Sequence, residues 1–208
     1  MKQLFFLCIF LALSSCNRKA SSALKSPDDE SSTFSSTQEK IILSADANTP
    51  MRLFLTTSLS DSTLLRQKSE AVIADPKDKV LTTMIDRLYA TVRDSLSLGV
   101  GIAAPQVGIS KNIIWVQRFD KEGYPFEVYL NPVIKQYTDK KQPCMEGCLS
   151  IPNKQAETQN RAYAILLEYD TRAGEHKIEM VEDFTAVIFQ HEIDHLNGIL
   201  FIDHLKEH

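Results

Sequence analysis

The sequence has little glycine, proline and cysteine, with 7, 8 and 4 residues, respectively, in a chain of 208. So few glycines and prolines argue against a fibrous or low-complexity chain, and four cysteines are too few for a disulfide-built scaffold. Positive charge is also scarce, because 27 acidic side chains outnumber 23 basic ones and leave a formal net charge of −4. A nucleic-acid partner is therefore not expected. The length suits one globular domain with an additional segment.

The additional segment is the N-terminus, which carries an apolar run too short to span a bilayer. The run covers Leu4 to Leu13, with Lys2 before it and small residues after it. This pattern is typical of an export signal. The stretch Leu13-Ser14-Ser15-Cys16 resembles the lipobox of bacterial lipoproteins, which implies a signal peptide over residues 1–15 and a lipid on Cys16. The alternative is an ordinary cleaved signal with an incidental cysteine.

Residues 17–40 are rich in serine and charge, and their only large apolar side chains are Leu24 and Phe34. Such a segment cannot bury enough surface to order itself, so we predict a disordered tether over residues 16–45. The folded, catalytic domain is expected over residues 46–208. The predicted product is an exported lipoprotein, held on the periplasmic or cell-surface side of a bacterial membrane by its N-terminal lipid.

Two histidines lie one helical turn apart in Gln190-His191-Glu192-Ile193-Asp194-His195. Residues i and i+4 share a helix face, so both imidazoles can bind one ion while Glu192 reaches a water beside it. The segment Glu146-Gly147-Cys148-Leu149-Ser150 supplies a thiolate from elsewhere in the chain. Three ligands with one position left for water suit the hydrolysis of an amide. The alternatives are a chance match on a charged helix end, a zinc peptidase with another third ligand, and a Cys144–Cys148 disulfide.

Hydrophobic periodicity predicts the main elements. Apolar residues at helical spacing indicate helices over residues 79–98 and 184–196, the second carrying both histidines inward. Strands are predicted at 113–116, 127–130 and 165–169, with 175–180 as a hairpin partner. Turns are predicted at Asn131-Pro132 and at residues 172–174. The remaining histidines lack partners at ligand spacing and are interpreted as surface residues: His176, His204 and His208.

Three segments, in this order along the chain, are similar to the signature motifs of the peptide deformylase family: Gly99-Val100-Gly101-Ile102-Ala103-Ala104-Pro105-Gln106, Glu146-Gly147-Cys148-Leu149-Ser150 and Gln190-His191-Glu192-Ile193-Asp194-His195. The resemblance covers roughly residues 51–205. It implies an α+β fold in which antiparallel β-sheets surround a central C-terminal helix that carries the H-E-x-x-H motif. It also implies an enzyme that removes formate from N-formylmethionyl peptides, and we expect a monomer.

The resemblance further assigns roles to individual residues. Cys148, His191 and His195 would bind the metal, with ferrous iron as the usual ion and zinc or nickel as substitutes. Glu192 would act as general base and then as general acid. Negative charge on the formyl oxygen would be stabilised by the Gln106 amide and the Leu149 backbone N–H. The peptide substrate would bind along Gly101, Ile102 and Gly147.

The chain departs from the family pattern at two positions where an arginine is expected. Gln155 stands at the first, which leaves substrate preference open. Asn160 stands near the second and Arg161 follows one residue late, so we hypothesise that Arg161 pairs with Glu146. Because an exported enzyme would not meet chains leaving the ribosome, two alternatives stay open. These are a metallohydrolase of the same fold acting on another N-acyl peptide, and a catalytically silent peptide-binding lipoprotein.

Overall fold

A computed structural model describes residues 33–94 and 99–205, which belong to one unit, Thr33–His208. The predicted signal peptide, Cys16 and most of the predicted tether lie outside the described residues, as does His208. Within the described part, no helix is long and apolar enough to cross a membrane.

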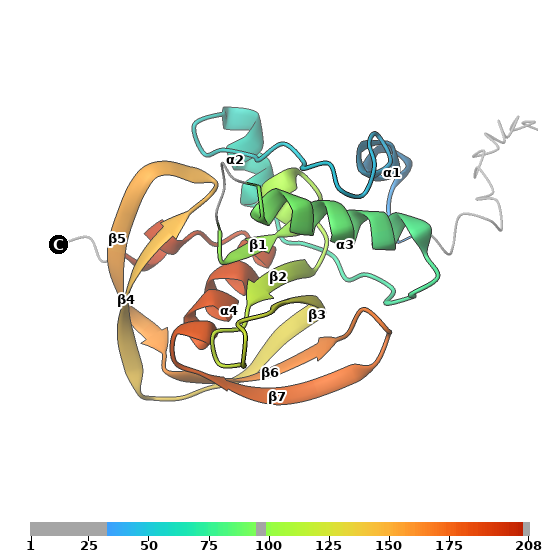
Figure 1. Ribbon diagram of the computed structural model, residues 1–208. Coiled ribbons are helices and arrows are strands. Elements are labelled where there is room, and N and C mark those ends of the chain that lie inside the picture. The colour runs from blue at the N-terminus through green and yellow to red at the C-terminus, as the bar shows by residue number, and fades with distance from the viewer. Residues whose placement is uncertain (1–32, 95–98, 206–208) are drawn as a thin grey trace, which may run out of the picture. The chain divides into compact units, whose positions relative to one another are not determined.

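Two antiparallel sheets form the β-structure (Figure 1). The five-stranded sheet has the order β1-β2-β3-β6-β7. Its strands are β1 (Gly101–Ala103), β2 (Ile113–Gln117), β3 (Phe126–Tyr137), β6 (Ala164–Asp170) and β7 (His176–Glu182). The second sheet is a hairpin of two strands, β4 (Lys141–Cys148) and β5 (Ile151–Ala162). The antiparallel α+β architecture expected from the resemblance is therefore present.

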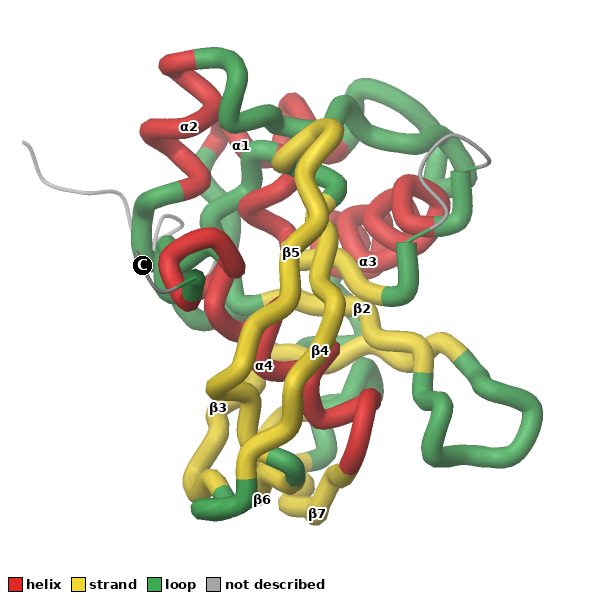
Figure 2. Tube along the Cα trace, turned by 90° about the vertical axis from the view of Figure 1, so that its left-hand side faces the viewer, coloured by secondary structure: helices red, strands yellow, loops and turns green. Residues whose placement is uncertain are grey.

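Helix α4 (Asp183–Leu196) lies in the middle of the fold. Figure 2 shows the β4–β5 hairpin lying across it, and the five-stranded sheet covers another side in Figure 1. Side chains alternate across β2, so Ile114 and Val116 pack with α4 while Ile113 and Trp115 pack with helix α3 (Lys79–Val92). Because α4 is covered by sheet and hairpin, polar groups on it are held in a dry and fixed environment.

The structure differs from the predicted tether over residues 33–45. A capped helix, α1 (Ser36–Ile42), occupies this stretch, and the side chains of Phe34 and Ile42 are buried in the core. The buried Arg87 of α3 donates hydrogen bonds to the carbonyl oxygens of Ile41 and Ile42, both at 2.9 Å. The segment is therefore ordered by two contributions: the burial of its few apolar side chains, and the hydrogen bonds from the distant Arg87 to the carbonyls at the end of α1.

Other element predictions can be compared directly. The strands predicted near residues 113, 165 and 175 are present, and the helix predicted from residue 79 is observed to Val92. Helix α2 (Leu59–Leu65) and both strands of the hairpin were not predicted. The predicted turn at Asn131-Pro132 is wrong, because both residues lie within β3 at a register shift. Asn131 has a positive φ of 50° there, and its side-chain amide bonds the backbone N–H and carbonyl of Val72.

Candidate metal centre

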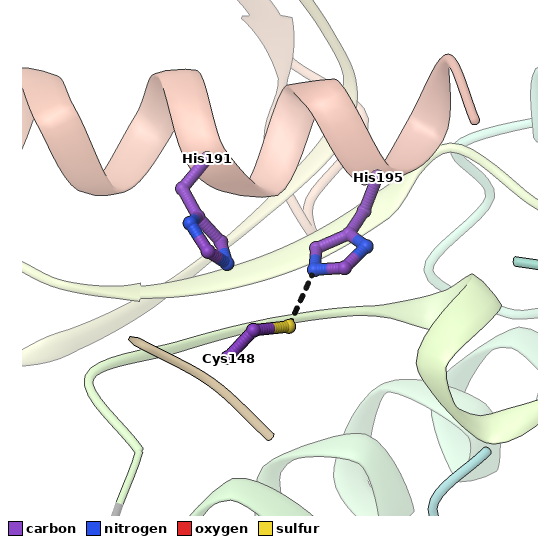
Figure 3. A group of neighbouring side chains, drawn as sticks. All are labelled: Cys148, His191 and His195. Atoms are coloured by element: carbon purple, nitrogen blue, oxygen red, sulfur yellow. Dashed lines mark hydrogen bonds between the residues drawn. The ribbon is translucent and has the colours of Figure 1, made fainter. Parts of the chain in front are cut away.

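Cys148, His191 and His195 converge on one point (Figure 3). One ligand atom from each lies within 4.8 Å of the other two, and Cys148 Sγ is 3.2 Å from His195 Nε2. Both histidines project from one face of α4, and Cys148 ends β4. Cys144 and Cys148 are both free, so the alternative of a disulfide between them does not hold in this structure.

Glu146 orients the first histidine. His191 Nδ1 lies 2.8 Å from Glu146 Oε2, so the Nδ1–H donates to the carboxylate and leaves Nε2 as the free ligand atom. Arg161 binds the same carboxylate at 2.8 and 3.0 Å, which confirms the hypothesised pair. Burial alone would raise the pKa of Glu146, but the hydrogen bonds from His191 and Arg161 outweigh it and hold that pKa well below its usual range.

Glu192 lies on the same helix, between the two histidines, and is buried. Its residue is 4% exposed, and Oε2 has no hydrogen-bond partner within the described residues. Burial is the main reason that its pKa is raised to about 7. A carboxyl group with that pKa can both accept and release a proton near neutral pH.

Gly101 provides the space that Glu192 occupies. A Cβ atom on Gly101 would lie 2.5 Å from Glu192 Oε1 and 2.9 Å from Ile188 Cγ2. A side chain at this position would have to displace the Glu192 carboxylate or Ile188, so the glycine permits the close approach of α4 to strand β1.

Gln106 is fixed with its side-chain amide nitrogen toward the three proposed metal ligands. The residue is 2% exposed, and its Oε1 accepts a hydrogen bond of 2.9 Å from the Ala103 backbone N–H. Its Nε2 donates to Ser150 Oγ at 3.2 Å and lies 3.6 Å from Cys148 Sγ. Because the oxygen end is held by the backbone, the donor end points to the place where the three ligands meet.

The group opens into a cleft of about 940 Å³. Seven of the predicted site residues line it: Gly101, Gln106, Gly147, Cys148, Leu149, His191 and Glu192. His195 lies deeper, 1% exposed, and burial lowers the pKa of its imidazole, which keeps the ring neutral as a metal ligand must be. The structure does not bring Ile102 to the cleft. Its side chain is fully buried toward α3, because neighbours in a strand point to opposite faces.

The donor set fits a divalent transition metal. One sulfur and two imidazole nitrogens suit zinc, iron or nickel better than magnesium or calcium, which prefer oxygen ligands. Glu192 Oε2 is one of the three buried side-chain atoms that lack a hydrogen-bond partner in the described part of the chain. A buried carboxylate oxygen without a partner is costly, and its place beside the three ligands is typical of a site built for a ligand.

Several supporting residues were not predicted from the sequence. Gln190 binds the backbone N–H and carbonyl of Ala162 at 2.9 and 3.0 Å, which fixes α4 to β5. His204 was interpreted as a surface residue, but its side chain is only 23% exposed and lies 2.8 Å from Asp194. His176 is exposed as predicted and contacts Asp170 at the sheet edge.

Comparisons with known proteins agree with this geometry. The family described as Polypeptide deformylase matches residues 57–208. The "Peptide deformylase" of Desulforudis audaxviator is 39% identical over 142 residues, covering 67% of this chain and 86% of that protein. "Peptide deformylase 1" of Clostridium acetobutylicum is 41% identical over 144 residues, covering 69% and 89%. A Met-Ala-Ser-bound crystal structure of class I type b peptide deformylase from Acinetobacter baumannii superposes with a TM-score of 0.67 at 31% identity, covering 76% of this chain and 99% of that one.

Proposed function

Because the chain belongs to the polypeptide deformylase family, we propose that Cys148, His191 and His195 hold the metal with which it removes the N-formyl group from N-formylated peptides. The enzyme is metal-dependent, and these residues form the one Cys/His/Asp/Glu group in the described residues whose ligand atoms come together closely enough to bind an ion. This convergence is the observation that carries the ligand assignment.

We propose that the ion is ferrous iron, as the resemblance to the peptide deformylase family implies, with zinc or nickel as substitutes. A thiolate is a soft ligand that donates more charge than an imidazole, which favours retention of a redox-active ion. When bound, such an ion lowers the pKa of a water molecule toward neutrality and polarises a carbonyl group.

Glu192 carries the proton in the proposed reaction. Its carboxylate accepts the proton of the attacking water as the formyl carbon is attacked, and then passes it to the amine that leaves. The carboxyl group suits both steps because burial places its pKa at about 7. The formyl C–N bond breaks, and formate and a free N-terminal amine result.

Gln106 and Leu149 stabilise the negative charge that develops on the formyl oxygen. The Gln106 Nε2–H group is already aimed at the ligand group, and Leu149 follows Cys148 in the wall of the cleft. In comparable sites, each hydrogen-bond donor fixed before the reaction stabilises the transition state by about 3–4 kcal/mol.

The substrate peptide lies along the free edge of β1. That strand pairs with β2 on one side only, and Gly101 lines the cleft on the other. An extended peptide can add to such an edge through backbone hydrogen bonds. Gly147 faces it from the opposite wall, and apolar side chains from α4 line the cleft where a methionine side chain would bind: Phe184, Val187 and Ile188.

We further propose that the enzyme acts outside the cytoplasm, anchored by a lipid on Cys16. The support is the sequence alone, which places a basic residue, an apolar run and a small-residue cysteine site in order. Labelling with a radioactive fatty acid tests this. Label in the wild-type chain and none in a Cys16→Ser variant is expected, together with release of the variant from the membrane fraction. An unlabelled wild-type chain would refute the anchor.

The decisive assay for the chemistry is formate release from formyl-Met-Ala-Ser, with acetyl-Met-Ala-Ser and unmodified Met-Ala-Ser as controls, and metal analysis of the same sample. We expect formate from the first peptide alone. A Glu192→Gln variant should lose turnover and keep its metal. A silent peptide binder would release no formate at all, and an enzyme for other acyl groups would prefer the acetylated peptide.

A further inference from the structure

A second cavity, of about 200 Å³, opens beside α4 and shares no lining residue with the substrate cleft. Its walls include Asn160 and Arg161 of β5, Asp194 of α4, and His204 of the C-terminal 3₁₀ helix Phe201–His204. These are polar side chains from three elements, and none of them touches the proposed substrate path.

A continuous series of hydrogen bonds runs from this cavity to the metal site. His204 Nε2 lies 2.8 Å from Asp194 Oδ2, and Arg161 Nη1 lies 2.6 Å from the same oxygen. Arg161 then binds both oxygens of Glu146, and Glu146 Oε2 is 2.8 Å from His191 Nδ1. Every link is a direct contact between two side chains.

The direction of the outermost bond follows from its neighbour. The Asn160 amide nitrogen, which can only donate, lies 3.2 Å from His204 Nδ1. Asp194 Oδ2 accepts at the other ring nitrogen, so Nε2 carries a proton and donates it to Asp194. The ring is thus fixed from both sides, by Asn160 and Asp194.

The orientation of the Asp194 side chain depends on His204 more than the orientations of Arg161 and Glu146 do. Arg161 and Glu146 are buried and bind each other through two parallel bonds, whereas the Asp194 side chain remains 18% exposed. Without His204, the carboxylate can turn to water, and Arg161 loses its fixed second anchor. The guanidinium and Glu146 would then hold the His191 ring less firmly.

We propose that His204 is a positioning residue for the metal site, holding His191 in its ligating orientation through Asp194, Arg161 and Glu146. The proposal rests on the assignment of His191 as a metal ligand. His204 does not touch the substrate or the metal ligands, so its effect falls on how long the metal is retained.

The test measures the rate at which the full chain, loaded with zinc, releases it to a chromophoric chelator. His204→Phe keeps the ring volume and removes the donor, and His204→Gln restores an N–H toward Asp194. His176→Phe is the matched control, because His176 also contacts an aspartate, with Nδ1 2.9 Å from Asp170 Oδ1, at the sheet edge. Circular dichroism at the assay temperature establishes that each variant is folded.

We expect His204→Phe to release zinc roughly 10-fold faster, the lower end of the effect of removing an outer partner of a ligand. His204→Gln should release zinc at nearly the wild-type rate, and His176→Phe should release it at the wild-type rate. Turnover per bound zinc should stay unchanged in all three. Wild-type release from His204→Phe, or no recovery in His204→Gln, would overturn the proposal. A wild-type chain that retains no zinc would instead refute the metal site itself.

Discussion

Substitution of Gly101 by alanine tests whether catalysis depends on the exact position of the Glu192 carboxylate. The added Cβ would lie 2.5 Å from Glu192 Oε1 and 2.9 Å from Glu192 Cδ, with Ile188 Cγ2 at 2.9 Å closing the other side. Because non-bonded carbon atoms prefer about 3.5–4.0 Å, the carboxylate must move by roughly 1 Å. A displacement of about 1 Å at a reacting group costs on the order of 100-fold in rate.

We therefore expect Gly101→Ala to lower kcat for formyl-Met-Ala-Ser about 100-fold, the cost attached to a 1 Å misplacement. The metal content should stay at the wild-type level, since Glu192 is not a proposed ligand. Overpacking of this kind also lowers the free energy of unfolding by about 1–3 kcal/mol, which thermal melting would report.

Gly147→Ala is the matched control in the opposite wall of the cleft. Its Cβ would meet the exposed Gln155 side chain at 3.2 Å, which can turn away. Because this Cβ meets only Gln155 and Lys154 atoms and does not approach Glu192, we expect kcat close to the wild-type value, and an effect on peptide binding would appear in KM. Wild-type kcat in Gly101→Ala, or equal damage in Gly147→Ala, would refute the role given to the space beside Glu192.

Three further variants probe other contacts. Gln106→Glu keeps an oxygen for the Ala103 N–H but removes the amide donor, so kcat should fall about 100- to 1,000-fold in formate release at saturating peptide. Unchanged kcat would exclude Gln106 from charge stabilisation. Cys148→Ser replaces a soft ligand by a hard one and should lower the zinc or iron bound per chain, measured by metal analysis; full occupancy would contradict the ligand assignment. Arg87→Met removes the donor to the carbonyls of Ile41 and Ile42 and should lower the free energy of unfolding in urea by about 1.5–3 kcal/mol, with kcat unchanged. An unaltered unfolding midpoint would show that α1 is held by its apolar contacts alone.

The sequence predicted those elements whose pattern is local. Helix α4 shows the apolar period of a helix with a buried face, and strands β2 and β6 are short runs of mostly buried apolar residues. Strand β7 was predicted only as the hairpin partner of β6, and its Ile178 and Met180 are exposed. The hairpin of β4 and β5 was missed because the less exposed positions of β4 carry Gln142, Cys144, Glu146 and Cys148 instead of large apolar side chains, and most of β5 is exposed, so neither strand shows an apolar alternation. Helix α1 was missed because its order depends on Arg87, some 45 residues away.

The metal ligands were predictable for a related reason. Two histidines at i and i+4 meet on one helix face whatever the rest of the fold does, so spacing alone indicates a shared ion. Gln106 is held by a local bond from the Ala103 N–H, but its contacts with Ser150 and Cys148 depend on how two distant segments pack. No local pattern carries that information, and only the resemblance indicated a role for Gln106.

The one-residue displacement of Arg161 has a structural cause in β5. Gln142 pairs with Arg161 and Cys144 with Thr158, so β5 contains one more residue than β4 between these two pairs. Strict alternation would place Thr158 and Arg161 on opposite faces, yet both are buried, while residues 159 and 160 are both exposed. The extra residue forms a β-bulge that turns Arg161 inward, to Glu146, and leaves Asn160 outside, beside His204. An arginine that follows its expected position by one residue thus reaches the same carboxylate, because the bulge shifts the register of the strand by the same amount.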